Sequence, residues 1–212
     1  MKIIFIPFLF FLLSFFLSSC TFFREDPLEE LRPSVPTLYN QALLMLTNME
    51  SFKANATVSY ISNRNINVYE TIQIGKSSGH YLIEVVAPEN LAGNITASNT
   101  IEIYQFNKNL GLTIYLGQAE TKERTSVLIT NFIYYYLNLE NVSHTENEDM
   151  VEFTVVLNYS NPYIYKQTLI VNAHLKPVSL ITYDINGEPR IIVEYGEFFH
   201  NIPIDVEIFS PS

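Results

Sequence analysis

From about residue 54 to the end of the chain, apolar and polar side chains alternate in short runs. A period of two is typical of strands with one buried face, and polar or glycine-containing segments separate one run from the next. Connections this short, without helices between successive runs, favour antiparallel pairing over a parallel sheet. The runs that we predict to be strands span residues 54–60, 66–74, 80–86, 100–106, 112–116, 151–157, 163–172, 178–185, 188–195 and 202–208.

The strongest turn signal is Asn186-Gly187, which lies between two of these runs. Both residue types tolerate a positive φ, so the pair predicts a hairpin. Pro203 cannot donate a hydrogen bond to a neighbouring strand, which predicts that the run 202–208 lies at an edge of the sheet. Two chains could pair through such an open edge, so a homodimer is an open alternative to a monomer.

Two stretches show the spacing of helices instead. Pro36 suits the first turn of one helix, and an apolar stripe follows it. The second stretch, residues 121–139, has Glu120 and Glu123 where they favourably meet the N-terminal dipole. The stripes consist of Leu38, Ala42, Met45, Leu46 and Met49 in the first helix, and of Leu128, Phe132, Tyr135, Tyr136 and Leu139 in the second.

Three adjacent tyrosines, Tyr134, Tyr135 and Tyr136, distinguish the second helix. Successive side chains point in different directions around a helix, so all three cannot face the core. At least one is expected to reach solvent, a cavity or a partner. A core helix with one exposed tyrosine is the simpler interpretation.

The composition supports one folded domain. The 212 residues are 48% hydrophobic, which is enough for a sizeable core. The formal charge of −10 excludes a nucleic-acid role, because phosphate binding needs a cationic face. We therefore predict an α+β, mainly β fold: a single strongly curved antiparallel sheet of about nine to eleven strands, wrapped around two or three helices.

The N-terminus has the pattern of a secretory signal. One lysine precedes an uncharged apolar run, residues 3–17, which is shorter than the roughly 20 residues of a membrane span. Leu17-Ser18-Ser19-Cys20 then resembles a bacterial lipobox. This resemblance implies cleavage between Ser19 and Cys20 and attachment of diacylglycerol to the Cys20 sulfur. A plain signal peptide with a chance cysteine is the alternative.

These features divide the chain into three parts: a signal peptide at residues 1–19, a lipidated flexible tether at 20–33 and a folded domain at 34–212. Two acyl chains give stable anchoring, whereas one would be marginal. We expect the mature protein on the extracytoplasmic face of a bacterial membrane. Its acidic surface is repelled by anionic lipid, so only the lipid anchor should hold it there.

No pattern of catalytic or metal-binding residues occurs in the sequence. His80, His144, His174 and His200 lie far apart, without a second ligand at metal-site spacing. The acidic residues 146–149 lack the spaced ligands and the turn glycine of an EF-hand calcium loop. There is no glycine-rich phosphate loop and no nucleophile elbow. We therefore predict no enzyme activity, no cofactor and no metal.

Several stretches resemble known families. Residues 81–93 and 101–107 are similar to a strand, a P-E-x-L-x-G turn and a second strand in lipoprotein carriers of the LolA/LolB type. The C-terminal half resembles the clostridial germination lipoproteins, the GerS family, more closely. The stretches that carry this second resemblance are residues 161–169, 176–178, 181–184 and 190–195, with Phe198. The resemblance spans roughly residues 35–210.

The resemblance implies a LolA-like half-barrel with helices in its mouth and no catalytic residue. It also implies a membrane-anchored lipoprotein that binds and assists a cell-wall (peptidoglycan) amidase in the spore cortex modification needed for germination. In a spore-former, the forespore intermembrane space is then the expected location. Since tyrosine is enriched at interfaces, we predict these candidate partner or lid contacts: Tyr134, Tyr135, Tyr136, Tyr159, Tyr163 and Tyr165.

The alternative function is that of a carrier or sensor for hydrophobic ligands or lipoproteins. It requires an open apolar cavity inside the half-barrel, with the second helix as a lid. A permanent anchor on the same protein argues against free shuttling between membranes. A structural or regulatory lipoprotein with another partner is the third interpretation.

Overall fold

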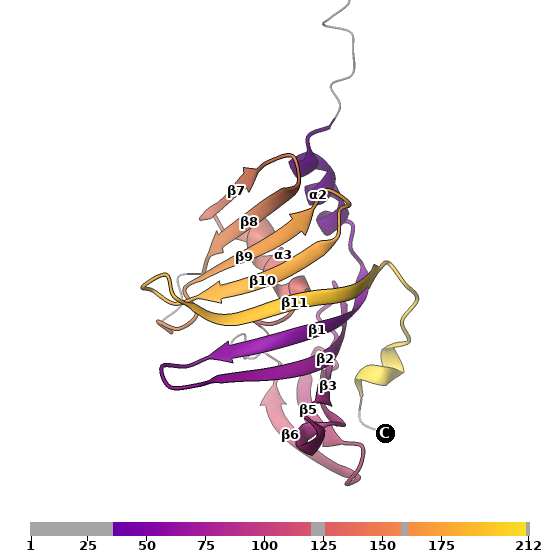
Figure 1. Cartoon of the computed structure of the whole chain (residues 1–212). Coiled ribbons are helices and arrows are strands. Elements are labelled where there is room, and N and C mark those ends of the chain that lie inside the picture. The colour runs from indigo at the N-terminus through magenta and orange to yellow at the C-terminus, as the bar shows by residue number, and fades with distance from the viewer. Residues whose placement is uncertain (1–35, 120–125, 158–160, 211–212) are drawn as a thin grey trace, which may run out of the picture. The chain divides into compact units, whose positions relative to one another are not determined.

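The sheet predicted from the alternating runs is present in the computed structural model, which describes residues 36–119, 126–157 and 161–210. In these residues eleven strands form one antiparallel sheet, in the order β6-β5-β4-β3-β2-β1-β11-β10-β9-β8-β7. The sheet is not closed, because β6 and β7 are its two edges. Figure 1 shows β1 and β11 side by side at its centre.

The strands are β1 (Ser51–Ile61), β2 (Ile66–Lys76), β3 (Tyr81–Ala87), β4 (Asn94–Ser98), β5 (Glu102–Asn107), β6 (Leu112–Gln118), β7 (Val142–Glu146), β8 (Met150–Val156), β9 (Lys166–Asn172), β10 (Pro177–Tyr183) and β11 (Pro189–His200). Two α-helices, α2 (Leu38–Thr47) and α3 (Ile129–Asn138), and two short 3₁₀ helices, η1 (Glu89–Leu91) and η3 (Val206–Phe209), complete the described elements. The mainly β fold, the antiparallel sheet and the two α-helices are thereby confirmed. β4 and β7 have no counterpart among the predicted runs.

The N-terminal predictions concern residues that the structure does not describe. The signal peptide, Cys20 and the tether all fall within residues 1–35, outside the described residues. Residues 36–212 form a compact unit of their own, which contains every described element and both apolar clusters defined below.

The prediction of a strand over residues 202–208 is wrong. Asn201 takes a left-handed conformation, with φ of 54°, and turns the chain out of β11. Its side chain holds this turn, because Oδ1 accepts the N–H of Glu50 at 2.8 Å and Nδ2 donates to the carbonyl of Asn48 at 3.1 Å. Asp205 then caps η3 through its carboxylate. The pairing between two chains predicted for this segment therefore has no strand on which to form.

Helix α2 is confirmed, but Pro36 lies before its N-cap and not in its first turn as predicted, and Met49 of the predicted stripe follows its end. Thr37 is its N-cap and accepts the N–H of Asn40 at 3.2 Å. Ala42 and Leu46, from the predicted stripe, are buried. The apolar spacing after Pro36 was therefore a sufficient signal for this helix.

Helix α3 begins later than predicted, at Ile129. Leu128 is extended, and its carbonyl accepts the first helical N–H groups. The predicted start at residue 121 is therefore wrong for residues 126–128. Residues 126–128 are buried, although they precede the helix. Their apolar side chains therefore continue the spacing of the helical stripe without being helical. Glu120 and Glu123 lie outside the described residues.

The Asn186-Gly187 hairpin between β10 and β11 is confirmed, with an addition. Only Gly187 of the pair takes a positive φ, of 83°. The carboxylate of Asp184 organises the rest of the turn: its Oδ1 accepts the N–H of Asn186 at 2.8 Å and of Glu188 at 2.9 Å. The buried carboxylate of Asp184 thus helps to stabilise the turn, a role that the sequence assigned to Asn186 and Gly187 alone.

The two halves of the sheet bury different faces. We call the face on which α2 and α3 pack the helix face, and the opposite one the outer face. β1 and β7–β11 form the covered half, because the helices pack on β7, β8 and β9. The main apolar cluster consists mostly of helix-face side chains of this half and of the two helices, such as Phe52, Phe132, Phe153, Leu169 and Val193, and Tyr81 of β3 joins it.

Strands β2–β6 form the open half, and its outer face holds a second apolar cluster. Leu82, Ile95 and Ala97 pack there around Phe209 of η3, which is fully buried. The chain after β11 thus crosses the outer face, as Figure 1 shows in yellow. Two hydrogen bonds fasten it: the Ser51 hydroxyl donates to the carbonyl of Ile202 at 2.7 Å, and Lys76 Nζ to that of Ile204 at 3.3 Å.

Candidate functional site

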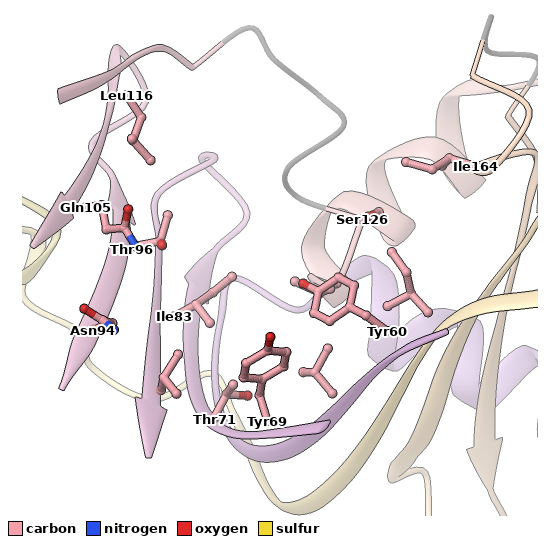
Figure 2. Close-up of a pocket in the computed structure, with 14 residues that line it drawn as sticks. Tyr60, Tyr69, Thr71, Ile83, Asn94, Thr96, Gln105, Leu116, Ser126 and Ile164 are labelled. Atoms are coloured by element: carbon pink, nitrogen blue, oxygen red, sulfur yellow. The ribbon is translucent and has the colours of Figure 1, made fainter. Parts of the chain in front are cut away.

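A pocket of about 530 Å³ lies on the helix face of the open half. Side chains of β1–β6 line one side of it, and Ser126 and Val127, which lead into α3, line another (Figure 2). Ile164 and Ile191 complete the lining from the covered half. The pocket exists because α2 and α3 extend over β7–β9 and leave this part of the helix face without a helix.

Strand pairing brings the lining residues together on one face. Thr71 of β2 pairs with Val85 of β3, and Ile83 of β3 pairs with Thr96 of β4. Thr96 in turn pairs with Gln105 of β5. Directly paired residues of neighbouring strands point to the same side of a sheet, so a row of side chains crosses the open half.

The lining mixes aliphatic and polar side chains and carries no charge. Aliphatic side chains and side chains with a polar atom contribute in equal number, and none of the lining residues is Asp, Glu, Lys or Arg. The polar groups are the hydroxyls of two tyrosines, two threonines and a serine, and the amides of Asn94 and Gln105. These groups can accept and donate hydrogen bonds, and no described lining residue carries a charge that could neutralise an ion.

Some of these polar groups are already used by the protein. The Thr71 hydroxyl donates to the carbonyl of Ala56 at 3.0 Å, and Asn107 Nδ2 donates to Asn94 Oδ1 at 2.7 Å. The side chains of Thr96 and Gln105, by contrast, make no hydrogen bond to any residue that the structure describes. They are therefore available to a ligand.

Two tyrosines form the aromatic part of the pocket. The rings of Tyr60 and Tyr69 meet edge to face, with centroids 5.8 Å apart. Burial of the phenol raises the pKa of Tyr60 above its ordinary value, and the neighbouring Tyr69 adds to the shift. The Tyr60 side chain nevertheless keeps 41% of its surface exposed, so part of its ring stays accessible. Figure 2 shows both rings at the centre of the pocket.

A polar side chain without a partner lies next to the pocket. Gln73 is fully buried, and neither its Oε1 nor its Nε2 has a hydrogen-bond partner among the described residues. It follows Thr71 by two positions on the same face of β2 and pairs with Ile83, which lines the pocket. Buried amides are rarely left unpaired in proteins, so this position calls for an explanation.

The orientation of β2 is opposite to the one that its alternation suggests. Ile66 and Val68 are exposed, whereas Thr71 and Gln73 are buried on the helix face. The apolar residues of this strand point to the outer face, where the second cluster shields Ile74. The pocket residues were consequently missed, because polar positions in a strand are normally assigned to solvent.

The predicted tyrosine row divides between core and surface. Tyr135 and Tyr136 are buried, and Tyr134 is 57% exposed, so one of the three reaches solvent as the helical geometry requires. Tyr136 packs against Phe132 and Phe153, with ring centroids at 5.9 and 5.3 Å. Burial, together with a hydrogen bond to Tyr39, raises the pKa of Tyr136. Tyr134 is therefore the row's candidate for a partner contact.

The second group of predicted tyrosines lies around the turn before β9. Tyr163 is 57% exposed, and the guanidinium of Arg190 lies 5.7 Å from its ring centroid. Tyr165 is half-buried, with its backbone bonded to Leu157 and Tyr183. Tyr159 lies outside the described residues. Of the two described members of this group, Tyr163 is thus the exposed one.

Arg190 links this surface to a buried carboxylate. Its Nη2 and Nε donate to Oδ2 of Asp184 at 2.6 and 2.8 Å, and its Nη1 donates to Asn63 Oδ1 at 2.9 Å. Burial alone would raise the pKa of Asp184, but hydrogen bonds from backbone N–H groups and from Arg190 outweigh it and lower the pKa. The ion pair orders the β10–β11 turn.

Within residues 36–119, 126–157 and 161–210, no three His, Cys, Asp or Glu side chains gather in a way that could hold a metal ion. His144 stacks on Tyr39, with centroids 3.7 Å apart, and His80 Nδ1 lies 2.9 Å from the Ser78 hydroxyl. No helix in the described part of the chain is long and apolar enough to cross a membrane.

A protein-family profile described as "Sporulation protein YdcC-like" matches residues 1–209. In the structure of the CwlD amidase from Clostridioides difficile in complex with the GerS lipoprotein, one chain is 23% identical to this one. That match covers 76% of this chain and 93% of the other, with a TM-score of 0.50.

The LolA superfamily protein NE2245 from Nitrosomonas europaea is 12% identical, with 83% of this chain and 98% of the other covered and a TM-score of 0.43. No curated protein sequence matches the chain. The family match and the C. difficile structure confirm the resemblance that the sequence indicates.

Proposed function

The chain belongs to the YdcC-like family of sporulation proteins, and from this we propose that it is a membrane-anchored, non-catalytic partner of a cell-wall amidase. One observation carries the proposal: its fold matches a chain in the complex of the CwlD amidase with the GerS lipoprotein over 93% of that chain. In this role the protein binds the amidase and assists its work on peptidoglycan during spore cortex modification.

The anchor in this proposal is a lipid on Cys20. A diacylglycerol contributes two acyl chains at about 0.8 kcal/mol per buried CH₂, which is enough for stable attachment. Attachment confines the protein to the extracytoplasmic face of a membrane, in a spore-former the forespore intermembrane space. Confinement to a surface raises the effective concentration of a partner there without any new contact.

We also propose that the sheet curves into a half-barrel around α3. The support is the burial pattern: helix-face side chains of β8, β9, β10 and β11, such as Phe153, Leu169, Leu180 and Val193, all reach the cluster that contains Phe132 of α3. A sheet that wraps a helix brings side chains of several successive strands to that helix, whereas a flat one presents fewer.

The exposed part of α3 is the proposed contact surface for the amidase. Tyr134, Leu137 and Leu139 are all exposed there, and none of them is needed for the core. An aromatic side chain flanked by aliphatic ones is typical of the centre of an interface. The formal charge of −10 favours encounter with a partner that presents a basic surface.

Binding and activation can be tested together. Residues 36–212 are mixed with the host's cell-wall amidase, the complex is followed by size-exclusion chromatography, and release of stem peptides from peptidoglycan is measured. We expect a complex and increased amidase activity. Tyr134→Ala should weaken the complex about tenfold or more, as interface tyrosines do. Tyr115→Ala is the matched control, because Tyr115 is similarly exposed but lies on β6. Absence of a complex, or equal effects of the two variants, contradicts the proposal.

The pocket favours a second candidate function, that of a carrier for small ligands. Its volume of about 530 Å³ lies within the usual range of ligand sites. A carrier for acyl chains, the alternative indicated by the sequence, requires an apolar interior. Thr96 and Gln105 add polar groups to a lining whose accessible surface is otherwise mostly apolar.

A further inference from the structure

We propose that the pocket on the helix face of the open half binds an uncharged carbohydrate, specifically a chain of N-acetylated sugars. The inference concerns a site separate from the exposed face of α3 and does not depend on the amidase partnership. Four properties of the pocket carry it: its charge, its aromatic rings, its unused polar groups and its size.

The charge of the pocket restricts the class of ligand. None of the 14 lining side chains that the structure describes is charged. The chain as a whole carries a formal charge of −10. A fatty-acid carboxylate, a phospholipid headgroup or a phosphate would find no cation among the described lining residues and would meet a chain of net negative charge. A neutral ligand meets neither obstacle.

The two tyrosines offer aromatic rings on which the apolar face of a sugar ring can pack. The C–H groups of a pyranose ring form an apolar face that packs on an aromatic ring, while its hydroxyls point outwards in the plane. Tyr60 offers a partly exposed ring, held in place by the edge-to-face contact with Tyr69 at 5.8 Å. Each phenol also offers a hydroxyl that can donate and accept a hydrogen bond.

The polar groups without partners can form hydrogen bonds with the hydroxyl and acetamido groups at the edges of a sugar ring. Thr96 and Gln105 are paired residues on β4 and β5, so a hydroxyl and a side-chain amide lie next to each other on the pocket wall. Neither is used by the described protein. An amide both donates and accepts, as do the hydroxyls and the acetamido group of an N-acetylated sugar.

The unpaired groups on the pocket wall favour a polar ligand over an acyl chain. An acyl chain would leave the side-chain polar groups of Thr96 and Gln105 unpaired in a dry environment, whereas a sugar or the water that accompanies it can pair them.

The site has room for such a ligand. Its volume of about 530 Å³ falls in the range of roughly 300–1,000 Å³ that small-molecule sites occupy. Its open side allows a chain longer than the pocket to extend beyond it. A segment of a polysaccharide can therefore bind without a free end.

The test is an NMR titration of residues 36–212, a compact unit of its own, with the tetramer of N-acetylglucosamine. We expect backbone amide shifts to change at β2–β5 and around Ser126, and not in residues 201–210, which follow β11 and contribute Phe209 to the outer cluster. A parallel titration with a neutral acyl probe, monodecanoylglycerol, tests the carrier alternative. The sugar is expected to bind and the acyl probe to bind at least about tenfold more weakly.

Variants locate the site. The double variant Thr96→Val, Gln105→Leu keeps the size of both side chains and removes their polar groups, so sugar affinity should fall about tenfold or more. Thr113→Val is the matched control: Thr113 pairs with Phe106, whose ring packs in the outer cluster, so its side chain lies on the other face. Thermal unfolding of both variants should resemble that of the wild type, which separates loss of binding from loss of fold.

The proposal is overturned by any of three results: no shift change with the sugar at millimolar concentration, shift changes confined to residues 201–210, or binding that the double variant leaves intact. Tighter binding of monodecanoylglycerol than of the sugar also overturns it and assigns the pocket to lipid. Because no amidase is present in these titrations, their failure leaves the proposed function unaffected.

Discussion

The covered and open halves of the sheet are built from similar strands but are buried in opposite ways. In the covered half the helix-face residues of β8, β9 and β10 reach the main cluster under α2 and α3. In the open half the outer face holds the cluster around Phe209, and the helix face carries the pocket. Most apolar burial therefore lies under the helices, and only the part of the helix face of β2–β5 that lines the pocket stays accessible.

The largest difference between the halves should appear when buried and exposed apolar residues are shortened. Phe153 is fully buried and contacts the rings of Tyr39 and Tyr136, so Phe153→Ala should lower the free energy of unfolding by about 3–5 kcal/mol. Ile114 of β6 is exposed, and Ile114→Ala should change that free energy by less than about 0.5 kcal/mol. Urea denaturation measures both. Similar losses would show that the halves are equally packed.

Removal of the anchor of the outer cluster should have a smaller, local effect. Phe209→Ala leaves a cavity between η3 and β3–β4 and should cost about 3 kcal/mol at most, since the terminal segment can detach without unfolding the sheet. Amide hydrogen exchange should accelerate in β3 and β4 and stay slow in β8–β10. Equal acceleration in both halves would mean that the two clusters unfold together.

The ion pair at the β10–β11 turn makes part of the stability depend on pH. Asp184 has a lowered pKa in the folded protein, so its contribution is fully present above the ordinary aspartate pKa of about 4 and is lost as the pH falls further. Asp184→Asn should remove this component from an acid titration of stability and leave the curve above neutral pH with the same shape. An unchanged acid dependence in the variant would assign it to other carboxylates.

The smallest expected difference in the free energy of unfolding comes from one threonine substitution in each half. The hydroxyls of Thr154 and Thr168 form a hydrogen bond of 3.0 Å in the covered half, so Thr154→Val should cost about 1 kcal/mol. Thr96 of the open half has no such bond, and Thr96→Val should change the free energy of unfolding by less than about 0.5 kcal/mol. Chemical denaturation of both variants resolves this difference. A larger loss at Thr96 would mean that its hydroxyl already serves the folded protein.

The sequence indicated most strands because alternation is a local property. The runs that became β1, β8, β9, β10 and β11 alternate in phase with burial on the helix face. The short strand β7 has five exposed residues and therefore no alternation to detect. α2 was equally visible, since its stripe and its position after Pro36 agree.

What the sequence could not reveal is which face a strand turns towards the helices. The apolar residues of β2 suggested that one face of this strand is buried. They did not show what buries it, because packing against the segment around Phe209 and packing against α3 produce the same alternation of apolar and polar residues. The same ambiguity hid the pocket, because Thr71, Thr96 and Gln105 look like solvent-facing residues in the sequence. Contacts across more than a hundred residues decide between the two faces.

The pairing of β1 with β11 also determines when the fold can form. β1 ends at Ile61 and β11 begins at Pro189, so the centre of the sheet joins strands from opposite ends of the domain. The strands on each side are sequential neighbours and can pair early as two separate meanders. Until β11 has been synthesised, both meanders present an unpaired inner edge, so an incomplete chain depends on protection from aggregation until its last strand arrives.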